Sequence, residues 1–119
     1  MDELFKELEA WGCNIQDALF NVMGDKEFYQ ELLRRFLKDP SIEELDKAVC
    51  RGDISVVIKA SHEIKGTTAT LGLLPLNQEI SKFLDIIRNE DVDTIRLQEI
   101  YSNVGKQFYI CRAILEKIS

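Results

Sequence analysis

Several features that define other classes of protein are missing from this sequence. It has two prolines, six glycines and a single histidine among 119 residues. No apolar run approaches the roughly 20 residues that cross a membrane. The first residues, Met1 to Leu4, are acidic and amphipathic, unlike the basic and then apolar layout of a signal peptide. We therefore expect a cytoplasmic protein that does not enter a membrane.

Cysteine is present, but not in a pattern that builds a site. Cys13, Cys50 and Cys111 are odd in number, far apart and outside any Cys-x-x-Cys pair. Zinc sites use closely spaced pairs of ligands, and a disulfide framework uses an even number of cysteines. We therefore expect three reduced thiols at half-buried positions on helices, in a reducing compartment, and no metal site.

Positive charge and nucleotide-binding loops are also lacking. Acidic residues number 21 against 15 basic ones, the formal net charge is −6, and no basic cluster is longer than Arg34-Arg35. Because nucleic acid is bound through a basic field, we do not expect it as a partner. No Gly-x-x-x-x-Gly-Lys-[Ser/Thr] or other glycine-rich phosphate loop is present, so the chain is not expected to bind ATP or to phosphorylate itself.

What the chain does contain is helical periodicity over its whole length. Its 119 residues suit a single domain with one core, residues 1–119. No segment reads as a strand, since Val56-Val57-Ile58 is short and lies within a helical pattern. Cap residues and glycines delimit helical segments at about 2–11, 14–24, 25–51, 53–72, 75–89 and 93–118. The sequence therefore predicts an all-α fold, an up-and-down four-helix bundle with one or two short additional N-terminal helices.

Pro40 leaves the segment 25–51 open to two interpretations. Proline permits either a break into two helices or one long helix with a kink. Ser41-x-x-Glu44 has the form of a capping box, which suits a new helix start. Because no glycine lies near Pro40, we favour the kinked helix.

The last helical segment carries apolar residues at heptad spacing. A coiled-coil dimer and a helix of a bundle both produce this pattern. We favour the bundle and expect a monomer. The residues of this heptad seam are Leu97, Tyr101, Val104, Phe108, Cys111, Leu115 and Ile118.

The single histidine, His62, lies in the segment 53–72. Helical geometry of about 100° per residue directs His62 roughly 130° away from the centre of the apolar stripe of that segment. We therefore expect the imidazole to face solvent or the rim of the core. A plain surface histidine is the simplest interpretation. The apolar stripe consists of Ile54, Val57, Ser61, Ile64, Thr68 and Leu71.

The neighbours of His62 on the helix favour a chemical role. Lys65 and Gly66 follow it by three and four residues, the spacing that places side chains side by side. Glycine within a helix costs about 1 kcal/mol relative to alanine, and it leaves bare backbone that a bulky group can approach. An exposed imidazole is largely neutral at pH 7 and is a nucleophile, while a nearby ammonium group stabilises the charge of a phosphoryl group. With Lys59 as a second, more weakly placed cation, the pattern suits acceptance of a phosphoryl group.

At these residues the sequence resembles the histidine-containing phosphotransfer (HPt) family of two-component phosphorelays. The motif stands here as Ser61-His62-Glu63-Ile64-Lys65-Gly66, followed after five residues by Gly72. Residues 24–36 resemble the second helix of the family, and residues 51–53 resemble the turn that precedes its histidine helix.

The resemblance implies a role for each residue of the motif. His62 is the expected phosphoacceptor, Lys65 is expected to interact with the phosphoryl group, and Gly66 to provide access. Some family members place a polar residue twenty-two positions after the histidine to bind the imidazole, but Leu84 occupies that position here. Glu63 or a water is the alternative means of orienting the ring, and Arg88 is a further candidate near the site.

The function implied is the relay of a phosphoryl group between aspartates of receiver domains through phosphohistidine at His62. The expected partners are receiver domains of response regulators, a hybrid histidine kinase, or both. Mg²⁺ is expected in the partner's receiver domain, with no cofactor bound by this chain. Two alternatives stay open: an adaptor that binds a receiver domain without transfer, and the phosphotransfer module of a larger histidine kinase. The Met1 start favours a free-standing protein.

Overall fold

All regular structure in the chain is helical. The computed structural model describes residues 2–118, in which there is no strand. This confirms the predicted all-α class. The elements are α1 (Asp2–Trp11), α2 (Ile15–Asn21), α3 (Lys26–Leu37), α4 (Pro40–Arg51), α5 (Ile54–Thr70), α6 (Leu74–Asn89), α7 (Thr94–Leu115) and the 3₁₀ turn η1 (Glu116–Ile118).

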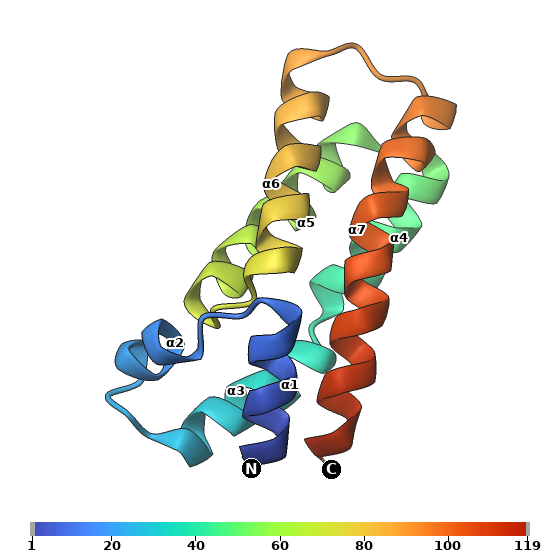
Figure 1. Cartoon of the computed structure of the whole chain (residues 1–119). Coiled ribbons are helices and arrows are strands. Elements are labelled where there is room, and N and C mark those ends of the chain that lie inside the picture. The colour runs from blue at the N-terminus through green and yellow to red at the C-terminus, as the bar shows by residue number, and fades with distance from the viewer. Residues whose placement is uncertain (1, 119) are drawn as a thin grey trace.

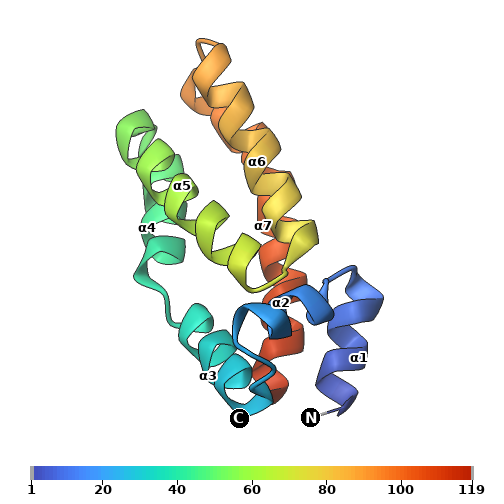
Figure 2. The ribbon, with the colours of Figure 1, turned by 90° about the vertical axis from the view of Figure 1, so that its left-hand side faces the viewer.

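Four of these helices close into a ring. α5 packs between α4 and α6, and α7 packs against both α4 and α6 on the other side (Figure 1). Short turns connect them, so that successive helices run in opposite directions. α1 and α3 pack against the remaining length of α7, and α2 lies beneath the C-terminal end of α5 (Figure 2). The predicted up-and-down four-helix bundle with additional N-terminal helices is confirmed.

Side-chain caps and left-handed glycines set the helix ends at the predicted places. The carboxylates of Asp25, Asp53 and Asp93 each accept a hydrogen bond from a backbone N–H in the first turn of the following helix. Such a bond satisfies a donor that has no partner inside the helix. Gly52 and Gly72, both with φ of +69°, follow α4 and α5 in a conformation that glycine adopts without strain.

The prediction of a kinked helix through Pro40 is wrong, because α3 ends at Leu37 and α4 begins at Pro40. Asp39 is extended, with φ of −65° and ψ of 119°, as the residue before a proline prefers to be. The Asp39 carboxylate accepts a hydrogen bond of 2.9 Å from the Ser41 N–H, so Asp39 caps α4 and Pro40 takes the first helical position. The expected capping box is also wrong, because the Ser41 hydroxyl donates to Glu63 instead.

The heptad seam of α7 is buried inside the bundle. Four of its members are at most 2% exposed, and Tyr101 and Phe108 are partly buried against the same core. This seam is therefore occupied by the chain's own helices, as the bundle interpretation predicts. The side chain of Ile118, the last predicted member, lies outside the described residues. The four buried members are Leu97, Val104, Cys111 and Leu115.

The cysteines are free thiols, as expected. The expected half-buried positions on helices are wrong, because Cys13 and Cys111 are buried, Cys50 is exposed, and Cys13 lies in the turn between α1 and α2. Burial raises the pKa of both Cys13 and Cys111 to about 12, so that these two thiols stay protonated and unreactive at neutral pH. Within residues 2–118 no helix combines the length and the apolar character needed to cross a membrane.

Candidate functional site

α5 turns its apolar stripe inward and His62 outward. Val57, Ser61, Ile64 and Thr68 are fully buried, whereas the His62 side chain is exposed. The helical period of 3.6 residues places the two faces on opposite sides of α5. The predicted outward direction of His62 is confirmed.

The His62 imidazole is not engaged by the rest of the molecule. Neither ring nitrogen forms a hydrogen bond or an ion pair with any other residue in the range 2–118. A lone pair on the ring is therefore accessible from solvent. This differs from a structural histidine, whose nitrogens are satisfied by neighbouring groups.

Lys65 and Gly66 lie beside His62 as the spacing predicts. A Cβ atom built on Gly66 would meet no atom within 4 Å, and Gly66 does not have a positive φ. Neither packing nor backbone conformation therefore requires glycine at this position. Lys65 is half-buried and Lys59 is exposed, and the described residues offer neither of their ammonium groups a carboxylate partner. Both cations are available to an incoming anion.

Glu63 and Leu84 are turned away from the imidazole. The Glu63 carboxylate accepts a hydrogen bond of 2.7 Å from the Ser41 hydroxyl, which links α5 to the first turn of α4. Leu84 is 1% exposed and belongs to the core. Neither residue forms a hydrogen bond with the ring, so no described side chain orients it.

Arg88 lies too far along α6 to join this group. Asn77, in the first turn of α6, bonds to Lys65, which fixes how the two antiparallel helices are aligned. Because the helices are antiparallel, Arg88, eleven positions after Asn77, lies beyond the level of His62, which is only three positions before Lys65. The difference of eight positions, at 1.5 Å per residue, places Arg88 about 12 Å from the level of His62 along the bundle. It is therefore level with the first turn of α5.

Sequence reasoning missed Asn77 as part of this region. Its side-chain amide donates hydrogen bonds to the Lys65 carbonyl at 2.9 Å and to the Thr68 hydroxyl at 3.1 Å. The available signal was its place one residue after Leu76 and three before Ile80, both fully buried. A polar side chain at the edge of an apolar stripe needs a partner, because burying it unpaired is costly.

One buried polar group next to His62 lacks a partner. The Ser61 hydroxyl is fully buried, and no residue in the range 2–118 forms a hydrogen bond with it. The three threonines that follow it on α5 all donate their hydroxyls to backbone carbonyls four residues earlier. Ser61 therefore contributes volume to the core rather than a hydrogen bond.

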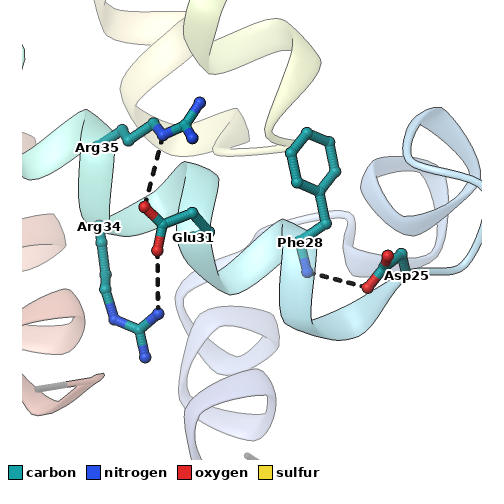
Figure 3. Close-up of polar contacts among 5 residues, drawn as sticks. All are labelled: Asp25, Phe28, Glu31, Arg34 and Arg35. Carbon is teal, nitrogen blue, oxygen red and sulfur yellow. Dashed lines mark hydrogen bonds and ion pairs between the residues drawn. The ribbon is translucent and has the colours of Figure 1, made fainter.

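The basic pair Arg34-Arg35 lies on α3 and does not extend the histidine face. Both guanidinium groups pair with Glu31, at 3.4 Å from Arg34 and 3.5 Å from Arg35 (Figure 3). These are exposed pairs, which contribute little to stability. Arg35 also borders a shallow cavity of about 260 Å³ between α3 and the end of α5, which does not include His62.

The candidate site is thus a strip of the outer surface of α5 formed by Lys59, His62, Lys65 and Gly66. Groups of three or more His, Cys, Asp or Glu side chains able to hold a metal ion are absent from the described residues. Comparison of the chain with protein-family models, with curated proteins and with solved structures found no significant match. The HPt resemblance therefore rests on the motif at residues 61–72 and the segments that flank it.

Proposed function

We propose that this chain is a histidine phosphotransfer protein that carries a phosphoryl group on His62. The observation that supports this proposal is an exposed imidazole with no partner, one helical turn from an unpaired lysine and a glycine that packing does not require. The donor is the aspartyl phosphate of a receiver domain, and the acceptor is an aspartate of a second receiver domain. A hybrid histidine kinase is the expected source of the phosphoryl group.

The transfer forms one bond and breaks one bond. A ring nitrogen of His62 attacks phosphorus, the new N–P bond forms, and the bond between phosphorus and the carboxyl oxygen of the aspartate breaks. The aspartate leaves as a carboxylate with the electron pair, and the proton on the other ring nitrogen is released to water. The Lys65 ammonium, one helical turn after His62, stabilises the charge on the phosphoryl oxygens. Mg²⁺ in the partner's acidic pocket supplies further charge stabilisation.

The exposed position of His62 on the outer surface of α5 suits a reaction between two proteins. The histidine has to enter the phosphoryl pocket of the partner, and a glycine one turn away leaves room for the partner's loops. Because the sequence has no nucleotide-binding loop, the phosphoryl group has to arrive from another protein. The strip that supplies the nucleophile is then also the centre of the docking surface.

Phosphoryl labelling with a His62 variant tests the proposal. The protein is incubated with phosphoramidate, a small-molecule phosphoryl donor, and with phosphorylated receiver domains of its own organism. The expected product is one acid-labile, alkali-stable phosphoryl group per chain, which His62→Gln abolishes while the circular dichroism spectrum stays helical. Label that survives in His62→Gln would contradict the proposal. Receiver binding without transfer, unaffected by His62→Ala, would instead indicate an adaptor.

A further inference from the structure

Asn77 holds α5 at the peptide bond between Lys65 and Gly66. Its Nδ2 atom donates to the Lys65 carbonyl at 2.9 Å and to the Thr68 hydroxyl at 3.1 Å, so both amide hydrogens are used. The Asn77 side chain is half-buried between the two helices. It is thus an interhelical contact directed at the backbone of the histidine motif.

The same peptide group is connected to His62 on its other side. In a continuous α-helix such as α5, the N–H of Gly66 donates to the carbonyl of the residue four positions earlier, which is His62. A peptide group is rigid and planar, so its carbonyl and its N–H move together. The Lys65–Gly66 peptide therefore connects the Asn77 amide, which binds its carbonyl, to the His62 carbonyl, which binds its N–H.

The helical turn around Gly66 is a weak part of α5, so a contact from another helix helps to hold it in place. Gly66 adds backbone freedom at the centre of this helical turn, and its position has no neighbouring side chain that could restrain it. Threonine hydroxyls that donate to carbonyls four residues earlier weaken and bend helices, and three such bonds follow in succession. The three bonds run from Thr67 to Glu63, from Thr68 to Ile64 and from Thr70 to Gly66.

We propose that Asn77 is a positioning residue for phosphoryl transfer at His62. By fixing the Lys65–Gly66 peptide, it keeps the Lys65 ammonium and the His62 ring in the mutual arrangement that the transfer requires. Asn77 itself does not touch the phosphoryl group. The inference rests on the proposed function of His62, and small displacements of a catalytic group are known to slow reactions.

The test compares Asn77→Ala with a control that removes the same kind of bond elsewhere on α5. Asn21 donates its side-chain amide to the Thr70 carbonyl at 3.1 Å, beyond the histidine motif, so Asn21→Ala is the matched control. Amide hydrogen exchange is measured at Gly66 and, as an internal reference on α5, at Ile58. In Asn77→Ala we expect the Gly66 amide to exchange about fivefold faster relative to Ile58, the factor of one ordinary hydrogen bond. In Asn21→Ala the ratio stays unchanged.

The second measurement is the rate of His62 phosphorylation by phosphoramidate. We expect it to fall roughly fivefold in Asn77→Ala and to stay unchanged in Asn21→Ala. Asn77→Asp keeps the size of the side chain and removes both donors, and it replaces Asn77→Ala if that variant loses helical structure. An unchanged exchange ratio at Gly66 in these variants would overturn the proposal, and so would faster exchange with an unchanged phosphorylation rate.

The two proposals fail in different ways. If wild-type protein takes up no phosphoryl group at His62, the proposed function fails and the positioning role for transfer fails with it. The exchange measurement still decides whether Asn77 fixes the Lys65–Gly66 peptide. If the wild-type protein is phosphorylated and the Asn77 variants match it, only the role of Asn77 is wrong.

Discussion

α5 and α7 each carry a glycine in mid-helix that packing does not require. A Cβ atom at Gly66 or at Gly105 would meet no atom within 4 Å, and neither glycine has a positive φ. Each glycine therefore lowers the stability of its helix by about 1 kcal/mol relative to alanine, and neither packing nor backbone conformation explains its presence. The two helices differ in what lies beside the glycine.

One turn before Gly66 stands an unpaired histidine, whereas one turn before Gly105 stands a tyrosine that the bundle uses. The Tyr101 hydroxyl donates to Asp46 of α4, and its ring lies 5.4 Å from that of Phe83 on α6. The structure gives Gly105 no comparable role. A glycine in a helix is thus a weak signal, and the proposed site rests on the unengaged groups next to it.

The largest difference between the two helices is expected for their lysines. Lys65→Gln removes a half-buried cation beside His62, whereas Lys106→Gln removes an exposed cation one residue after Gly105. We expect Lys65→Gln to slow phosphoryl transfer to His62 by about a hundredfold, the scale of losing one positioned charge-stabilising group. Lys106→Gln should leave the rate unchanged. Initial rates from a phosphorylated receiver domain check both, and equal rates for the two variants would remove the distinction between the helices.

Alkaline pH should act on buried or partly buried cysteines and tyrosines, of which Cys111 and Tyr101 lie on α7. The pKa values of Cys13 and Cys111 are raised by burial from the ordinary 9.0 to about 12, and burial raises the pKa of Tyr29 and Tyr101 as well. Because the folded pKa is the higher one, this stabilisation is complete below pH 9 and is lost as pH rises towards 12. We expect the free energy of unfolding to fall by roughly 1 kcal/mol per thiol for each pH unit above 9.

Urea denaturation at pH 7 to 11 measures this loss. Cys111→Ala should reduce the slope of stability against pH, and His62→Gln should leave it unchanged. An unfolding free energy that is level between pH 9 and 11 would show that the thiols are not buried as described.

The smallest effects are expected for the glycines themselves. Gly66→Ala and Gly105→Ala should each raise the free energy of unfolding by about 0.5–1 kcal/mol, because both positions have room for a methyl group. Gly66→Ala should also slow transfer from a receiver domain by roughly tenfold, since the methyl group occupies space the partner uses. Gly105→Ala should be as active as wild type. If Gly66→Ala gains stability and keeps full activity, the proposed access role of Gly66 is wrong.

Much of the fold was predictable because local chemistry decides it. Asp25, Asp53 and Asp93 cap the helices that they precede, and Gly52 and Gly72 adopt the left-handed conformation at the expected ends. The outward direction of His62 followed from the helical period alone. These features depend on residues within a few positions of one another.

The break at Pro40 and the contact of Asn77 depend on more than neighbouring residues. Asp39 and Ser41 are both acceptable caps, and the choice is coupled to Glu63, which binds the Ser41 hydroxyl from another helix. The bond from Asn77 to the Lys65 carbonyl requires a particular alignment of α5 with α6. Interhelical alignment is set by side-chain packing, which a single sequence does not display.

The order of the bundle helices also bears on how quickly the site can form. α4, α5, α6 and α7 each pack against the next helix in the chain, so most of the ring is built from contacts between consecutive segments. Chains dominated by such local contacts fold rapidly, because little loop entropy is lost before the contacts form. The strip around His62 and its support from Asn77 both lie within the single hairpin of α5 and α6. Its assembly therefore does not have to wait for α1 and α3 to find α7.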